Sequence, residues 1–160
     1  FFRLYKERHP GPLALALVGP VAVSIPEDED VIVTGVVSEA DKWDLVRDAQ
    51  VAISPSALES FSLVVLEAWE KSVPVIVNAT CEPTREHCQR SGGGLWFGSF
   101  REFEVVLERL CADAALRQLL GHRGHAYVET YYQWPAVIRR YARFLTTVTE
   151  RGPRWTRADT

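Results

Sequence analysis

Residues 54–78 of the chain read SPSALESFSLVVLEAWEKSVPVIVN, and they contain the alternation of strand and helix that decides the fold. A short strand is predicted at Val51–Ile53, a helix at Phe61–Lys71 and a further strand at Val73–Val77. Apolar strands without polar alternation are buried on both faces, which is typical of parallel sheets covered by helices. The stretch therefore predicts a β-α-β unit.

The same alternation continues on both sides of this unit. Further strands are predicted at Leu13–Val18, Val31–Gly35 and Leu95–Phe97. Helices are predicted at Phe1–His9, after a Ser38–Asp41 capping pair, and at Thr84–Arg90, Glu102–Cys111, Ala114–Tyr131 (with a break near Gly121–Gly124) and Pro135–Thr149. This order predicts the α/β class, a Rossmann-like doubly wound parallel sheet with a helical C-terminal segment. Residues 1–150 would form one domain and residues 151–160 a polar tail.

Length and composition exclude several classes of protein. The 160 residues are 47% hydrophobic and 24% charged, which is typical of one soluble globular domain. A net charge of -3 gives no electrostatic footprint for nucleic acid, so no nucleic-acid partner is expected. The cysteines Cys81, Cys88 and Cys111 form no C-x-x-C pair, which argues against zinc and indicates a reducing, cytoplasmic compartment.

The predicted helix in the central stretch offers an anion site at its N-terminus. If it begins near Ser60, the backbone N–H groups from Ser60 to Leu63 have no partner within the helix, and the macrodipole adds partial positive charge. The hydroxyls of Ser60 and Ser62 can donate further hydrogen bonds. The turn from strand to helix is therefore predicted to bind phosphate.

Two carboxylates bracket this turn. Glu59 precedes the helix, and Glu67 follows eight residues later, about 12 Å along an axis that rises about 1.5 Å per residue. The carboxyl pairs of glycosidases are closer, about 5–9.5 Å apart. The wider spacing suits a ligand with hydroxyls at both ends and phosphates between, such as a nucleoside diphosphate sugar. The alternative is a capping acid at Glu59 and a solvated Glu67.

The E-x7-E pattern of Glu59 and Glu67 resembles the signature of retaining glycosyltransferases of the GT-B fold, in the group-one class (glycosyltransferase family four). The run Gly35-Val36-Val37-Ser38 resembles the G-x-V-S loop of that family, and the resemblance covers nearly the whole chain. The segment from Cys81-Glu82 to Ser91-Gly92-Gly93-Gly94-Leu95 resembles one bacterial subgroup of the family. The run Tyr131-Tyr132-Gln133-Trp134 resembles the start of the family's closing C-terminal helix.

The resemblance implies the donor-binding C-terminal domain of an enzyme that moves a sugar, typically a hexose, from a nucleotide-diphosphate sugar to an acceptor hydroxyl. Glu59 would be the catalytic acid that holds the donor sugar, and Glu67 would accept from ribose. The remaining donor-binding residues would be Gly35 and Val36 at the base, and Ser60, Phe61, Ser62 and Leu63 at the phosphates and sugar. No cofactor or metal is implied, because no Asp-x-Asp occurs at the strand ends and the acidic run Glu27–Asp30 lies in a loop before a strand.

A second hypothesis is a non-catalytic GT-B-like module that binds a sugar nucleotide or a protein partner, although the presence of both Glu59 and Glu67 favours the enzyme. The resemblance also implies an upstream acceptor-binding Rossmann-like domain as partner. Six arginines make the C-terminus basic and indicate a solvated face, with contact to that domain or peripheral contact with an anionic membrane surface as alternatives: Arg139, Arg140, Arg143, Arg151, Arg154 and Arg157.

The chain contains no methionine, not even at position 1, so it is expected to begin inside a longer polypeptide. In a sheet of order 3-2-1-4-5-6 the first strand is central. The chain opens in what resembles the helix after that strand, so Leu13–Val18 and Val51–Ile53 would be the two neighbours of a missing strand. The family's phosphate-neutralising Arg and Lys would also lie upstream. We therefore expect the isolated chain neither to fold stably nor to transfer sugar.

Several other residues are interpreted as structural. His122 and His125 are three apart, but they are expected to be surface residues and not metal ligands. Cys81 and Cys88 are expected to pack in the interior. Four aromatic residues are expected in the core: Trp69, Trp96, Phe97 and Tyr141.

Overall fold

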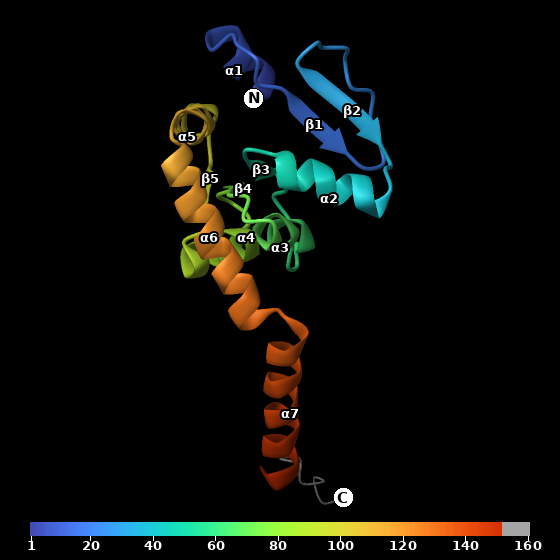
Figure 1. Ribbon diagram of the computed structural model, residues 1–160, viewed down its shortest axis with the longest axis vertical. Coiled ribbons are helices and arrows are strands. Elements are labelled where there is room, and N and C mark those ends of the chain that lie inside the picture. The colour runs from blue at the N-terminus through green and yellow to red at the C-terminus, as the bar shows by residue number, and fades with distance from the viewer. Residues whose placement is uncertain (152–160) are drawn as a thin grey trace, which may run out of the picture.

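The computed structural model describes residues 1–151, so the predicted tail beyond Arg151 lies outside the described residues. In chain order the elements are α1 (Phe2–Arg8), β1 (Leu15–Val18), β2 (Val31–Gly35), α2 (Glu39–Asp48), β3 (Ala52–Ser54), α3 (Leu63–Glu70), β4 (Val75–Asn78), α4 (Glu82–Ser91), β5 (Gly94–Phe97), α5 (Phe100–Ala112), α6 (Ala114–Tyr131) and α7 (Trp134–Arg151) (Figure 1). The predicted elements are all present, with ends that differ by a few residues.

The strands are parallel, as predicted, and they form two sheets. β1 pairs with β2, with Leu15 opposite Val31, and the second sheet has the order β3-β4-β5. Within residues 1–151, β1 and β3 each have a strand on one side only. The sheet is therefore divided between β1 and β3, the place where the sequence predicts a missing first strand.

The core surrounds β4, whose residues alternate between two clusters of buried side chains. Val75 and Val77 belong to the cluster that contains Trp69 of α3 and Tyr127 of α6. Ile76 belongs to the other cluster, with residues of α1, α5 and α6: Phe2, Tyr5, Phe103, Leu107, Leu110 and Leu120, joined by Phe97 of β5. Such alternation is expected when both faces of a parallel strand are covered by helices.

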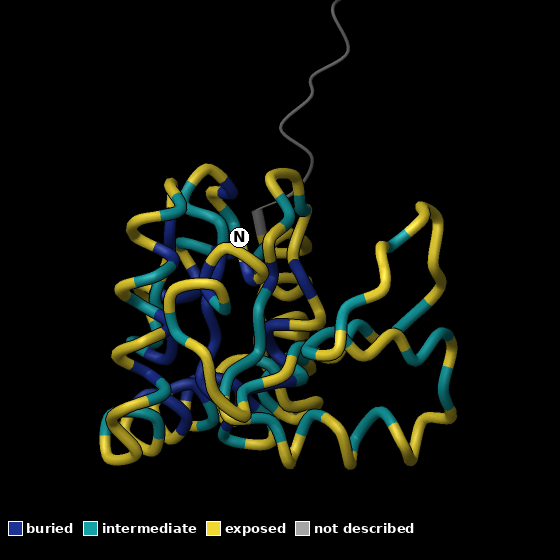
Figure 2. Tube along the Cα trace, turned by 90° about the horizontal axis from the view of Figure 1, so that it is seen from above, coloured by how far each residue is buried: buried dark blue, intermediate teal, exposed yellow. Residues whose placement is uncertain are grey.

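The first third of the chain is less well buried than the part from β3 to α6. From Lys6 to Ile53 no residue is buried, whereas buried residues concentrate around β4, α3, α4 and α6 (Figure 2). The helical spacing of Ala40, Trp43, Val46 and Ala49 predicts that α2 buries these residues, but Ala40 is exposed and the other three are only half-buried. The division of the sheet leaves α2 without a continuous sheet surface to cover.

The α6 helix passes very close to α3, and its two internal glycines explain how. A Cβ at Gly121 would lie 1.8 Å from the carbonyl oxygen of Ser72, and one at Gly124 would lie 2.1 Å from the Trp69 ring. The predicted break at these glycines is wrong, since α6 is continuous from Ala114 to Tyr131. Glycine is needed here for close approach of two helices.

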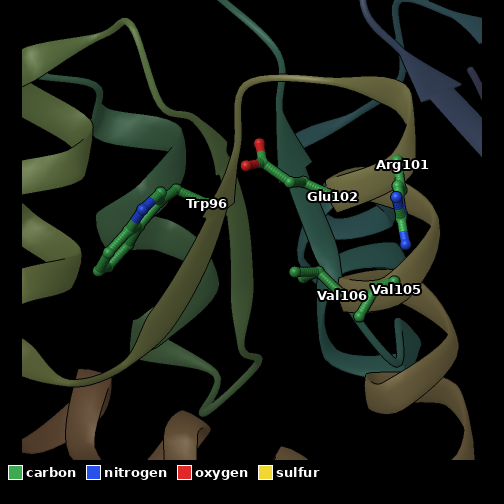
Figure 3. A pocket seen from close by; sticks show the side chains of 5 residues that line it. All are labelled: Trp96, Arg101, Glu102, Val105 and Val106. Atoms are coloured by element: carbon green, nitrogen blue, oxygen red, sulfur yellow. The ribbon is translucent and has the colours of Figure 1, made fainter.

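Two of the four aromatic residues assigned to the core are there: Trp69 is fully buried and Phe97 is 6% exposed. Trp96 and Tyr141 are exposed, so their assignment is wrong. Trp96 is turned away from Phe97 on β5 and lines an open hollow of about 300 Å³ with Arg101, Glu102, Val105 and Val106 of α5 (Figure 3).

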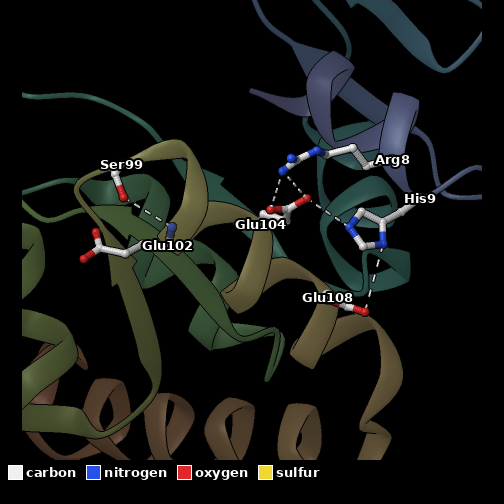
Figure 4. Close-up of polar contacts among 6 residues, drawn as sticks. All are labelled: Arg8, His9, Ser99, Glu102, Glu104 and Glu108. Atoms are coloured by element: carbon white, nitrogen blue, oxygen red, sulfur yellow. Dashed lines mark hydrogen bonds and ion pairs between the residues drawn. The ribbon is translucent and has the colours of Figure 1, made fainter.

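Polar contacts attach α1 to α5 (Figure 4). The guanidinium of Arg8 lies 2.9 Å from the Glu104 carboxylate, and His9 Nε2 lies 3.1 Å from it. Burial alone would raise the pKa of Glu104, but hydrogen bonds from His9 and Arg8 hold it below its ordinary value. At the start of α5, Ser99 Oγ accepts from the backbone N–H of Glu102 and caps the helix.

The last helix, α7, extends away from the domain (Figure 1). Tyr141 is one of several large apolar residues on α7 that remain exposed: Trp134, Ile138, Tyr141, Phe144, Leu145 and Val148. None of the helices within residues 1–151 is both long and apolar enough to cross a membrane.

Candidate functional site

The loop that carries Glu59 lies at the carboxyl ends of β3 and β4. It leaves β3 at Ser54 and reaches α3 at Leu63. The side-chain amide of Asn78, at the end of β4, donates to the carbonyl oxygen of Pro55 at 3.0 Å and fixes the beginning of the loop. Ligands of open α/β sheets bind at the carboxyl ends of the strands.

The helix α3 begins later than the sequence predicts. Its N-cap is Ser62 and its first residue is Leu63, so Ser60 and Phe61 precede the helix. The four backbone N–H groups without an intrahelical partner are therefore those of residues 62–65. The predicted anion site is moved by about two residues, and Ser60 contributes from the loop.

Ser62 combines two unfavourable features. Its backbone is left-handed, with φ 65° and ψ 81°, which costs about 1–2 kcal/mol for a residue with a Cβ. Its side chain is 7% exposed, and its Oγ has no hydrogen-bond partner among the described residues. The hydroxyl does not cap α3. Local strain of this kind concentrates at ligand-binding sites.

The strain at Ser62 gives a stability prediction. Replacing Ser62 with glycine should raise the free energy of unfolding by about 1 kcal/mol, because glycine accepts the positive φ and removes the unpaired hydroxyl at some entropic cost. Urea unfolding would measure the change. Ser60→Gly is the matched control: Ser60 is exposed and not left-handed, so this variant should be neutral or slightly destabilised. Equal effects of the two variants would contradict the strain at Ser62.

Glu67 lies in the second turn of α3 and pairs with a cation that the sequence analysis did not identify. Lys42 Nζ of α2 donates to Glu67 at 3.1 Å and lies 2.9 Å from Glu39. Hydrogen bonds to Glu39 and then to Glu67 raise the pKa of Lys42. No sequence spacing signals this pair, because its members are 25 residues apart on different helices.

The Lys42–Glu67 pair joins α3 to the element that follows the predicted base-binding loop. Gly35 ends β2 with a left-handed φ of 66°, and Val36 is 78% exposed in the short loop before α2. The positive φ accounts for a glycine at this turn. Ser38 caps α2 by accepting from the N–H of Asp41, as predicted. The loop presents backbone groups and an apolar side chain, which suit the edge and face of a flat ring.

Glu59 is half-buried in the loop. Among residues 1–151 no hydrogen bond or ion pair engages its carboxylate, so this carboxylate can accept hydrogen bonds from a ligand's hydroxyl groups. The structure thus brings together an acid on the loop, a strained serine with the unpaired amides of α3, and a second acid paired with lysine.

The residues interpreted as structural have structural surroundings. His122 is exposed, and Nδ1 of His125 lies 3.2 Å and 3.1 Å from the carbonyl oxygens of Trp69 and Glu70 at the end of α3. Cys81 and Cys88 are buried, which confirms their packing role, and burial raises the pKa of Cys88 to about 12. No cluster of three histidine, cysteine or acidic side chains that could hold a metal ion occurs in the described part of the chain.

Comparison with known proteins identifies the family and the fold of the chain. The family model for glycosyl transferases group 1 matches residues 27–125, more than half of the chain. A sucrose-phosphate synthase from Thermosynechococcus elongatus has a similar fold, with a TM-score of 0.66 and 22% identity over 78% of this chain and 31% of that one. WaaG, a glycosyltransferase involved in lipopolysaccharide biosynthesis, gives 0.61 and 17% identity over 81% and 36%.

The chain spans about a third of the length of these solved structures. At these low identities the two structures show a similar fold and nothing more. That fold confirms the predicted Rossmann-like α/β class. The family match confirms the expected group-one class, and it includes both Glu59 and Glu67. The chain therefore belongs to the group 1 glycosyl transferases.

Proposed function

We propose that the chain is the donor-binding domain of a retaining glycosyltransferase, which transfers a hexose from a nucleotide-diphosphate sugar to an acceptor hydroxyl. The observation that carries this proposal is the buried, left-handed and unpaired Ser62 at the start of α3, between Glu59 and Glu67. A helix N-terminus with unpaired donors binds phosphate groups. Family membership supports the reaction class.

Each part of the site has a role in this proposal. The amides of residues 62–65 and the positive end of the α3 dipole stabilise the diphosphate, whose charge grows as it leaves. Glu67, which pairs with Lys42, accepts hydrogen bonds from ribose hydroxyls. Glu59 accepts from hydroxyls of the donor sugar, and the loop at Gly35 and Val36 contacts the base.

The proposal is tested by titrating a panel of nucleotide sugars against the complete protein and its Glu67→Ala variant. The variant should bind the preferred donor more weakly by about 1–3 kcal/mol, the value of a lost hydrogen bond to a charged group. Glu70→Ala on the same helix is the control, since Glu70 hydrogen bonds to Gln133 and should leave affinity unchanged. Equal donor affinity of Glu67→Ala and wild type would remove Glu67 from the site.

Metal dependence gives an independent test. We propose that the backbone donors of α3 act without a divalent cation, because no group of three histidine, cysteine or acidic side chains that could hold a metal ion occurs among the described residues. Sugar transfer by the complete enzyme should therefore continue at an unchanged rate in EDTA. Loss of transfer on chelation, with recovery on adding Mg²⁺ or Mn²⁺, would contradict this mechanism.

We further propose that the chain works beside an acceptor-binding domain. The chain covers only 31% and 36% of the solved glycosyltransferase structures that it matches. The exposed apolar residues of α7 suit contact with another folded domain more than with water. Such a domain would supply the acceptor hydroxyl and exclude water from the donor.

A further inference from the structure

The ammonium group of Lys42 lies between the two helices next to the proposed nucleoside site. Lys42 belongs to α2, which follows the loop at Gly35 and Val36 and contacts α3 (Figure 1). Its Nζ lies 2.9 Å from a carboxylate oxygen of Glu39, three residues earlier on α2, and 3.1 Å from one of Glu67 on α3. The ammonium group therefore joins α2 to α3 at the proposed ribose acid.

The indole ring of Trp43 gives this ammonium group a further contact. Lys42 Nζ lies 4.8 Å from the centroid of the ring, within the range of a cation–π interaction. Nζ of Lys71, the residue that follows α3, lies 4.9 Å from the same centroid. Lys71 is exposed, and no carboxylate within residues 1–151 pairs with it. The two lysines share one ring, but Lys42 alone of the two is paired with Glu67.

The carboxylate of Glu67 depends on Lys42 for its position. No other side chain in the described part of the chain donates a hydrogen bond to it. The side chains of Lys42 and Glu67 are 26% and 31% exposed, so a ligand can reach the pair from solvent. A free glutamate side chain has many rotamers, and fixing it costs entropy. An acid that is already held in place therefore loses less entropy when it accepts from a ligand.

We propose that Lys42 is a positioning residue, which holds the Glu67 carboxylate in place for the donor's ribose and at a fixed distance from the base-binding loop. Ser38 and Asp41 attach that loop to α2, because Ser38 Oγ accepts from the N–H of Asp41 and donates to its carboxylate. Lys42 is the next residue, so the loop, the lysine and the acid form one connected unit. The effect on donor binding rests on the proposed function, whereas the hold on Glu67 does not.

Replacing Lys42 with methionine removes the ammonium group and keeps an apolar side chain. We expect donor KM of the complete enzyme to rise roughly tenfold in Lys42→Met, with kcat changed by less than about twofold. Lys42→Arg should recover part of the wild-type KM, because a guanidinium group can also donate to Glu67. Lys71→Met is the matched control, since it removes the other cation on Trp43, and it should leave donor KM unchanged. Partly exposed ion pairs add little to stability, so each variant should fold as the wild type does.

A double-mutant cycle shows whether Lys42 acts through Glu67. In a Glu67→Ala background, Lys42→Met should raise donor KM by less than about twofold, because the acid that Lys42 positions is absent. If the effects of the two substitutions multiply, Lys42 acts on the donor by its own charge, and the proposal is overturned. Equal rises of donor KM in Lys42→Met and Lys71→Met would also overturn it.

Side-chain NMR of the ligand-free complete protein measures the hold on Glu67 without a donor. The γ protons of Glu67 should have distinct resonances in the wild type and should converge in Lys42→Met, because exchange among rotamers averages their surroundings. Unchanged γ-proton resonances in Lys42→Met would overturn the proposal. Convergence of the resonances, with donor KM unchanged in both Lys42→Met and Glu67→Ala, would retain the positioning of Glu67 and contradict the proposed donor site.

Discussion

Replacing Glu59 with glutamine should lower the turnover of the complete enzyme by roughly a hundredfold, while donor affinity changes by only a few-fold. The expected loss has the size found when one preorganised electrostatic contact to a transition state is removed, about 10²–10³ in kcat. Glu59 stands on the loop before α3, where its carboxylate is half-buried and has no partner among the described residues. The contact between this carboxylate and the donor sugar can therefore become stronger as positive charge develops on the sugar in the transition state.

Steady-state kinetics of Glu59→Gln, with kcat and donor KM determined separately, would measure this effect. Glutamine keeps the size of the side chain, so a change in folding is not expected to contribute. Glu7→Gln is the control, since Glu7 is an exposed acid on α1. Wild-type turnover in Glu59→Gln would show that the acid has no part in the reaction, and an effect confined to KM would make Glu59 a ground-state binding residue.

The sequence predicts the parallel sheet well because its strands are strongly patterned. The continuous apolar run Val75-Ile76-Val77 was interpreted as a strand buried on both faces. All three residues are at most 1% exposed in β4, which confirms this interpretation. The roles of the E-x7-E acids Glu59 and Glu67 stay a prediction, which rests on local features, their spacing and the strands that flank them. The family resemblance is confirmed by the match over residues 27–125.

The predicted start of α3 is wrong because contacts with distant parts of the chain, and not the local sequence, determine where the helix begins. Apolar periodicity includes Phe61, but that ring packs against His87 and Tyr132 and not along the helix. The serine at position 62 gave no signal for a left-handed residue, because that conformation is typical of glycine. The Lys42–Glu67 pair and the His87–Tyr127 contact join distant segments, and no local pattern reports them.

The low helix propensity of glycine led to a wrong prediction in α6. Gly121 and Gly124 are unfavourable in a helix interior, so they indicated a break. Their cost is offset by the close contact with Ser72 and Trp69, which any Cβ would prevent. Packing of α6 against α3 and Ser72 thus determines the local structure. The glycines can be explained only when the position of these neighbours is known.

The divided sheet leaves specific backbone groups without partners. The N–H of Leu15 donates to the carbonyl oxygen of Asp30, directly before β2, and the N–H of Ala52 donates to that of Pro74, directly before β4. Alternate residues of a parallel strand direct their N–H and C=O groups to opposite sides. Ala16 and Ile53 therefore direct theirs toward the open edges of β1 and β3, where the described residues provide no strand.

We expect a further parallel strand, supplied by additional polypeptide or by a partner chain, to lie between β1 and β3 in the functional protein. Unpaired edges inside a sheet cost about 1–3 kcal/mol for each buried group, against a total stability of about 5–15 kcal/mol for a domain. The absence of any buried residue between Lys6 and Ile53 fits a region that lacks its central strand. The isolated 160-residue chain should accordingly fail to melt cooperatively as a whole and should transfer no sugar.

Amide hydrogen exchange would test this expectation residue by residue. In the complete protein, the amides of Ala16 and Ile53 should be protected at least a hundredfold more than in the isolated chain, about 2.8 kcal/mol at about 1.4 kcal/mol per factor of ten. The Ala52 amide is the reference, because its hydrogen bond to Pro74 belongs to the better-packed sheet and should give protection in both forms. A strand between β1 and β3 would protect the amides of both Ala16 and Ile53, because it would pair with both open edges. Rapid exchange of both amides in the complete protein, or one cooperative melt of the isolated chain with measurable sugar transfer, would contradict the missing strand.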